Sequence, residues 1–230
     1  MDTLSEQLFE RLCDIQAVQW ERIATTSAMR TPDYNIWLGS TKVIIEVKQL
    51  DLSKADRQTI EAWRQGGNLP AAFASNAHRR VRNIIGSASK QLRRLAKGKH
   101  PSIIVLFDNT HGFSYLDLED ILNAMYGDET VTVSWPNAPS VKPMITGHRF
   151  GGHRKMTPDH NRSVSGLGLL RIDGTSSQPF LTLFHNIHAE IVLLPEVATQ
   201  LVVKQYTIDK ESSEHYQFWR EIHRHTDDIS

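Results

Sequence analysis

Cysteine is nearly absent from this sequence, since Cys13 is the only one among 230 residues. A single cysteine excludes an intramolecular disulfide and fits a reducing compartment, so a fold held together by disulfide bonds is ruled out. Cys13 follows Leu12 in a segment of helical character, where a thiol is more often a small buried apolar group than a nucleophile. We therefore expect a cytoplasmic protein.

Long hydrophobic runs are also absent. No stretch approaches the roughly 20 apolar residues of a membrane-spanning helix, and the N-terminal segment is acidic and amphipathic, unlike a signal peptide. Hydrophobic residues make up 40% of the chain and charged residues 23%, which is ordinary for a soluble globular protein. The length fits one large domain or a core with an elaboration, and no membrane partner is expected.

The chain has no net charge either, because 26 Lys and Arg residues balance 26 Asp and Glu residues. Its bulk charge therefore gives no sign of a nucleic-acid-binding protein. The distribution is uneven, however. Residues 77–100 include eight Lys or Arg and no acid, whereas the tail from Asp209 is mixed and net acidic. One positive region thus stands against a neutral background.

The sequence does contain the signal of a β-hairpin. The β-branched and aromatic runs 34–38 and 43–48 predict two strands, and Gly39-Ser40 between them is typical of a two-residue type II′ turn. With that turn, the numbers of facing residues sum to 79, so that Asp33 lies opposite Glu46. Side chains alternate between the faces of a strand. One face is then uniformly apolar, and the other carries both carboxylates.

Two facing carboxylates need a physical reason, because like charges at such positions are destabilising. A divalent cation is one reason, since Mg²⁺ takes carboxylate oxygens and water as ligands. The ion could lower the pKa of a bound water and neutralise charge that builds on a phosphate. Lys48, on the same face as Glu46, would then orient or activate the attacking water. The alternative is a solvated polar face on which Lys42 and Lys48 offset the acids.

These residues also form a pattern that resembles a known family. Pro32-Asp33, followed after the hairpin by Glu46-Val47-Lys48, resembles the signature of the PD-(D/E)XK nuclease superfamily. Phe9-Glu10-Arg11, on a predicted first helix, is similar to the Phe-Glu-Arg of archaeal Holliday-junction resolvases, one branch of that superfamily. The resemblance covers residues 3–49 and extends to about 109. It implies an α/β fold with a restriction-endonuclease-like α-β-β-β-α-β core in residues 1–112. Residues 113–230 would be a mixed α/β extension, either separate or part of the same compact domain.

The resemblance further implies Mg²⁺-dependent hydrolysis of phosphodiester bonds, with Mn²⁺ able to substitute, and DNA as a more suitable substrate than RNA. Asp33 and Glu46 would be metal ligands and Lys48 the catalytic lysine. Glu10 would complete the metal shell, and Gln49 would lie beside the site. Helical periodicity alone leaves Glu10 at the surface as an alternative. By analogy, the protein would form a homodimer in order to cut two strands.

Two basic segments are candidates for holding phosphates. A long amphipathic helix predicted over 76–97 has a basic face with no acid for i, i+4 pairing, which favours phosphate contact over simple solvation. Gln91 borders its apolar stripe and could face either the cleft or the core. Residues 136–166, rich in Pro, Gly, His and Arg, predict a long loop that grips the substrate. The candidate nucleic-acid-binding residues are Arg79, Arg80, Arg82, Lys90, Arg93, Arg94, Lys97, Arg149, Arg154, Lys155 and Arg162.

The remaining elements follow from capping signals and apolar runs. Capping patterns at Thr3, Ser53 and Asp117 predict three helix starts, and residues 213–225 predict a terminal helix. Strands are predicted over 103–107, 131–135, 167–172 and 180–184, while 191–194 and 201–208 would add two strands or a strand and a helix. The histidines match no common zinc spacing.

Two alternatives to the nuclease remain. The chain could be a nucleic-acid-binding or assembly subunit that keeps the fold and does not cut, or a protein-interaction scaffold whose hairpin charges are only surface charges. The intact Asp33, Glu46 and Lys48 favour the nuclease over the first alternative. The acid-free basic helix favours it over the second.

Overall fold

The computed structural model describes residues 2–24, 31–67, 77–96, 98–110, 116–135, 142–208 and 219–223. It is a mixed α/β structure, which confirms the α/β part of the predicted fold class. No helix within these ranges is both long and apolar enough to cross a membrane. The elements in chain order are α1 Leu4–Ile15, β1 Gln19–Arg22, β2 Tyr34–Leu38, β3 Thr41–Asp51, α2 Lys54–Arg64, α3 Ala77–Ala96, β4 Ser102–Asn109, α4 Leu118–Tyr126, β5 Glu129–Ser134, β6 Met144–Phe150, β7 Gly166–Ile172, β8 Pro179–His185, α5 Pro195–Ala198, β9 Lys204–Ile208 and β10 Trp219–Glu221.

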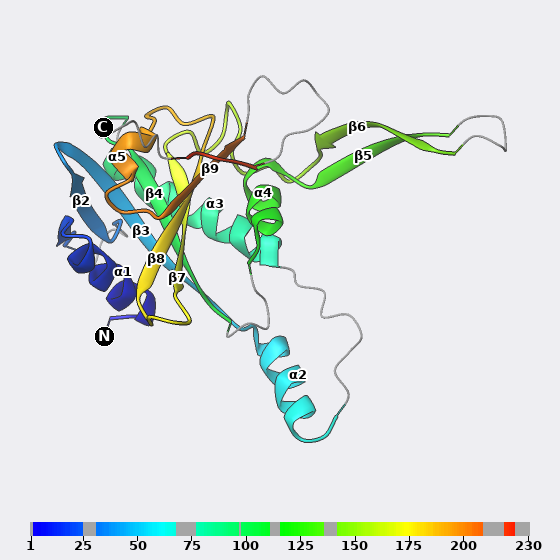
Figure 1. The fold of residues 1–230 in the computed structure, drawn as a ribbon, viewed down its shortest axis with the longest axis horizontal. Coiled ribbons are helices and arrows are strands. Elements are labelled where there is room, and N and C mark those ends of the chain that lie inside the picture. Colours follow the sequence, from blue (N-terminus) through cyan, green and yellow to red (C-terminus); the bar gives the residue numbers. More distant parts are fainter. Residues whose placement is uncertain are drawn as a thin grey trace, which may run out of the picture.

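An eight-stranded sheet forms the centre of the molecule, in the order β1-β2-β3-β4-β7-β8-β9-β10 (Figure 1). Strands β3, β4 and β7 are parallel neighbours, as are β8 and β9, and the other pairs are antiparallel. The pairing of β4 with β7 carries the sheet from the first half of the chain into the second. Residue 112 therefore does not separate two sheets.

Helices cover both faces of this sheet. On one face, Phe9 and Leu12 of α1 belong to a buried cluster with β-strand residues such as Ile45. On the other, Ile85 of α3 belongs to a second buried cluster, which includes Ile44 and residues of α4. Because successive side chains of β3 alternate between these clusters, Glu46 and Lys48 lie on the α3 face.

The capping signals in the sequence are confirmed at three helix starts. Thr3, Ser53 and Asp117 each form a complete capping box at the start of α1, α2 and α4. Each cap satisfies backbone N–H groups that have no partner within the helix, and so determines where the helix begins. In α1, the expected burial of Cys13 is confirmed and Phe9 is buried as well, whereas Leu4 and Ile15 are exposed.

In the second half of the chain, three predicted segments differ from the structure in the parts that it describes. Within the expected loop 136–166, β6 pairs with β5 in a two-stranded hairpin that extends away from the sheet (Figure 1). Residues 191–194 form neither a strand nor a helix and lead irregularly into α5, whereas β9 lies within the apolar segment 201–208 as expected. In the expected terminal helix, Trp219–Glu221 form strand β10 against β9, and most of the helix's other residues lie outside the described ranges. In β6 and β10 the structure comes from pairing with a partner strand, which overrides local propensity.

Candidate active site

The β2–β3 hairpin has the register that the sequence predicts. Its ladder pairs Leu38 with Thr41 and continues to the pair Tyr34 and Ile45. Gly39 has φ +58°, whereas Ser40 is not among the residues with positive φ, which fits a type II′ turn. Only glycine adopts the first position of this turn without strain. The turn therefore determines which residues of the two strands face each other.

Asp33 lies where the regular ladder ends. Its backbone N–H still donates to the carbonyl of Ile45 (3.0 Å), and its side chain then bonds to β3, since the Val47 N–H donates to Asp33 Oδ2 (2.7 Å). This bond holds the Asp33 carboxylate against the strand that carries Glu46. The hairpin thus brings the two acids together, as the register predicts.

Glu46 is fully buried, and Lys48 forms an ion pair with its Oε1. Neither carboxylate oxygen accepts a well-oriented hydrogen bond from the described residues. Burial, and then the negative charge of Asp33, raise the pKa of Glu46 to about 7, while Lys48 and the Gln91 amide oppose the shift. When Glu46 is ionised, its carboxylate has therefore lost its hydration, and the hydrogen bonds and charges around it do not fully replace the lost water.

Burial likewise raises the pKa of Asp33, against the lowering effects of the Val47 N–H and the charge of Lys48. Two neighbouring carboxyl groups with raised pKa values fit a divalent cation, which would replace a proton and offset both charges. Within the described residues, no group of three or more His, Cys, Asp or Glu side chains could hold a metal. A site with two carboxylates suits Mg²⁺, which is usually bound by one or two carboxylates and keeps several waters.

Glu10 does not join this site, which corrects the predicted role. Arg22 Nε donates to Glu10 Oε1 (2.6 Å), and the Tyr34 hydroxyl donates to the same oxygen (2.8 Å). Tyr34 packs against Phe9 in the cluster on the α1 face. Glu10 is therefore on the side of the sheet opposite Glu46, with Arg22 as its counter-charge.

Gln49 also lies away from the carboxylates, because it follows Lys48 and points to the opposite face of β3. Its Oε1 accepts from the Ser5 N–H (3.2 Å), and its Nε2 donates to Asp51 Oδ1 (2.8 Å). This side chain fastens the first turn of α1 to the sheet. The structure therefore supports a structural role for Gln49 instead of the predicted one.

The chain matches none of the protein-family models, curated proteins or solved structures with which it was compared.

Two residues that the sequence did not assign to the site act on it in the structure. Gln91, on α3, lies beside Glu46, and its Nε2 also donates to the Thr31 carbonyl (3.4 Å). The negative charge of Glu6, on α1, raises the pKa of Asp33. For Gln91 the only sequence signal was its position at the border of an apolar stripe. For Glu6, the capping pattern at Thr3 predicted only a role in starting the helix.

The basic face of α3 is only partly available to a ligand. Arg82 is buried, its Nη2 donates to the Asn123 carbonyl (2.8 Å), and its guanidinium forms an ion pair with Asp128. The side chain of Arg82 is therefore held within the fold, unlike the exposed basic residues with which it was grouped in the sequence. Arg80 is half-buried and donates to the Asp51 carbonyl at the end of β3. The exposed basic residues of α3 are Arg79, Lys90, Arg93 and Arg94.

In the second basic segment, Arg154 and Arg162 are exposed and Lys155 is half-buried. Lys97 and the side chain of Arg149 lie outside the described parts of the chain. Arg162 and Arg93 line a hollow of about 370 Å³ next to Glu190 and Asp159. The two basic segments therefore meet alongside α3, although the acids reduce the positive charge at this point.

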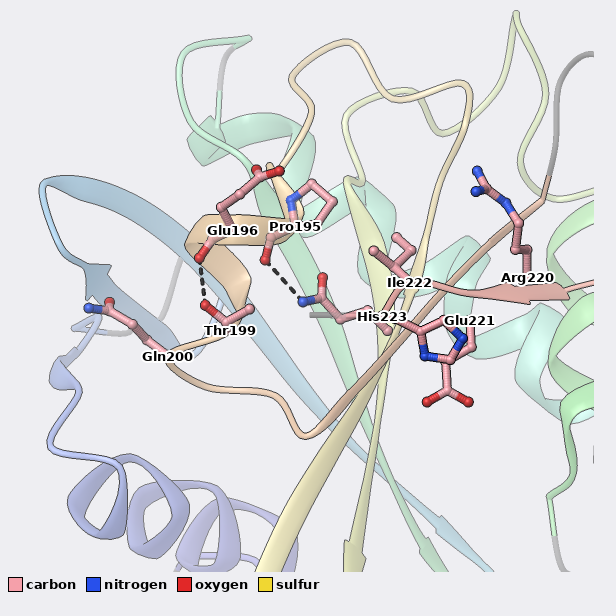
Figure 2. Close-up of a pocket in the computed structure, with 9 residues that line it drawn as sticks. Pro195, Glu196, Thr199, Gln200, Arg220, Glu221, Ile222 and His223 are labelled. Carbon is pink, nitrogen blue, oxygen red and sulfur yellow. Dashed lines mark hydrogen bonds between the residues drawn. The ribbon is translucent and has the colours of Figure 1, made fainter. Parts of the chain in front are cut away.

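A hollow of about 720 Å³ lies elsewhere, between α5, β9 and β10 (Figure 2). Its two carboxylates, Glu196 and Glu221, point away from each other. Beneath it, buried His185 shares a hydrogen bond with Gln205 (2.8 Å), and burial lowers the pKa of this histidine, which favours the neutral ring. The hollow therefore lacks the paired acids found at the hairpin.

Proposed function

We propose that this protein is a Mg²⁺-dependent nuclease of the PD-(D/E)XK type that hydrolyses phosphodiester bonds in DNA. One observation carries the proposal: the Val47 N–H holds Asp33 beside the fully buried Glu46, and Lys48 lies against the Glu46 carboxylate. An acid pair with raised pKa values and an adjacent lysine is costly for a fold to maintain, and such groups cluster at functional sites.

The order of elements supports the proposal. Helix α1, strands β1 to β3, helix α3 and strand β4 follow the α-β-β-β-α-β order that the sequence resemblance implies, with α2 as an addition. Strand β4 lies parallel to β3, next to the strand that carries Glu46 and Lys48. The candidate site therefore lies within the region that the resemblance covers.

Each group has a distinct role in the proposed reaction. Asp33 and Glu46 would hold Mg²⁺, which supplies Lewis-acid activation of phosphodiester hydrolysis. Lys48, whose side chain is 31% exposed, can orient a water toward the phosphorus and offset charge on the phosphate oxygens. The Gln91 amide helps to position Glu46 from the side of α3.

The test is a cleavage assay on plasmid, linear, single-stranded and branched DNA and on RNA, with Mg²⁺, Mn²⁺ or EDTA. Asp33→Asn, Glu46→Gln and Lys48→Ala should each lower the rate by about 10² or more, which is the typical contribution of such groups. Lys42→Ala is the matched control, because Lys42 lies on the same strand and stacks over Trp37 (5.6 Å) away from the carboxylates.

Three outcomes separate the possible functions. Cleavage that needs the metal and is lost in the three variants supports the proposal. Cleavage that persists in them would place the active site elsewhere. If the protein binds DNA but does not cut it with any of the metal ions tested, the result would indicate the non-cleaving binding subunit.

A further inference from the structure

A basic hollow of about 550 Å³ lies beside the N-terminal half of α3, where this helix meets the turn after α4 and the segment after β6. The Lys and Arg residues that line it are Arg79, Arg82, Arg154 and Lys155, whereas Asp128 is its one acid among the described residues. Both basic segments of the sequence therefore contribute to one concave surface.

Asp128 offsets only part of the positive charge of the hollow, because it is paired with Arg82 and His153, which also line it. Arg82 forms an ion pair with it, and His153 Nδ1 lies 2.9 Å from its Oδ2. Arg82, and then His153, lower the pKa of Asp128, so that it remains ionised in this network. Buried Arg82 also donates to the Asn123 carbonyl, which fixes this wall of the hollow to α4.

Two other cations that line the hollow, Arg79 and Lys155, have fewer side-chain partners. Neither Arg79 nor Lys155 has an acidic partner in the described part of the chain. The backbone N–H of Lys155 donates to the Met125 carbonyl (3.1 Å), which anchors this residue at the end of α4. Its Nζ lies 3.9 Å from the position that a Cβ on Gly86 would occupy, so the ammonium group is directed toward α3. Arg154 is anchored as well, since its Nε donates to the Gly151 carbonyl (3.0 Å).

We propose that this hollow binds a phosphate group of the nucleic-acid backbone, remote from the bond that is cut. Fixed cations around a concave surface are the complement of a phosphate, which accepts hydrogen bonds from Arg and Lys. The inference rests on the proposed function, because it takes the substrate of the hairpin site to be a nucleic acid. It assigns to that substrate a second point of attachment.

The geometry of α3 sets the distance between the two points. Arg79 precedes Gln91 by twelve residues, which corresponds to about 18 Å along the helix axis and about a third of a turn around it. Exposed Lys90 lies between these positions, and exposed Arg94 follows Gln91 by three residues, on a helix without acids. For a duplex that runs along α3, with a rise of about 3.4 Å per base pair, the substrate would extend about five base pairs beyond the cleavage point to reach the hollow.

The experiment compares Arg79→Ala, Lys155→Ala and the double variant with Arg57→Ala, a control on the exposed surface of α2. Binding of a duplex of about 30 base pairs is measured by fluorescence anisotropy over a range of salt concentrations, in EDTA and in Ca²⁺. The double variant should bind at least about tenfold more weakly, and its salt slope should fall by about one, because one phosphate contact contributes about 0.9. A titration with inorganic phosphate, followed by NMR, should shift resonances of the hollow in the wild type only.

Cleavage in Mg²⁺ then links the hollow to the active site. On the long duplex, the double variant should show a raised KM and an unchanged kcat. On duplexes with fewer than about five base pairs on either side of the cut, it should match the wild type. Wild-type affinity and salt slope in the double variant would overturn the inference even if the protein cleaves DNA. Binding that depends on Arg79 and Lys155, without cleavage in any metal, would retain the hollow and reject the nuclease.

Discussion

At the scale of single residues, Glu46 makes the protein sensitive to pH, because its carboxyl group is buried beside a second acid. The neutral form of such a group is favoured in the folded state, whereas the unfolded chain ionises it near the ordinary value of 4.5. Between pH 4.5 and about 7, the folded protein therefore holds a proton that the unfolded chain has released. Over this range, the contribution of Glu46 to stability falls as the pH rises.

This shift predicts how the stability of metal-free protein depends on pH. Between pH 5 and pH 8, the free energy of unfolding of the wild type should decrease by up to about 3 kcal/mol relative to Glu46→Gln, from 1.36 kcal/mol per pKa unit. Denaturant unfolding in EDTA at several pH values measures the difference. Parallel pH profiles for the two proteins would contradict a raised pKa of Glu46.

The sequence predicted part of this site because the hairpin is a local structure. Gly39-Ser40 determined the register, and the register placed Asp33, Glu46 and Lys48. The contribution of Gln91 depends on how α3 packs across the sheet, 45 residues away from Glu46 in the chain, and no local pattern encodes that angle. Glu10 illustrates the same limit, since its partner Arg22 belongs to a different element.

At the scale of elements, Arg82 joins α3 to α4 and to the start of the β5–β6 hairpin. In the sequence it looked like its basic neighbours, because periodicity places it at the border of the apolar stripe. Its partners, Asn123 and Asp128, follow 41 and 46 residues later. Burial of this guanidinium is thus a property of the packed helices, which helical periodicity alone could not predict.

Arg82→Ala should accordingly lower stability by about 2–3 kcal/mol, because the Asn123 carbonyl loses its donor and Asp128 loses its ion-pair partner. Arg79→Ala, on the exposed side of the same helix, should change stability by no more than about 0.5 kcal/mol. Urea unfolding of the two variants and the wild type provides the comparison. Equal midpoints for both variants would show that Arg82 does not hold the helices together.

At the scale of the whole molecule, β4 is the strand on which both halves of the chain depend. Its residues 102–107 are buried, and β3 and β7 bond to its two edges. The sequence predicted β4 from its apolar run, yet could not show that its second neighbour is formed by residues 166–172. A strand pairing across this distance leaves no local pattern.

A fragment of residues 1–112 should therefore fail to fold, because removal of β7 exposes an apolar edge of β4. We expect it to be insoluble when produced alone, and soluble when residues 113–230 are produced with it. Solubility and the dispersion of amide NMR resonances distinguish the two cases. A folded, monomeric fragment would show that the N-terminal half is an independent domain.

The parallel pairing of β4 with β7 also has a consequence for protein synthesis. The chain must grow by 57 residues after Asn109 before β7 begins at Gly166. At 5–20 residues per second, this leaves β4 with one open edge for about 3 to 11 s on the ribosome. During that interval the nascent chain presents an apolar strand to other chains in the cell. Slower translation should therefore increase aggregation, and a chaperone that covers this strand should raise the yield.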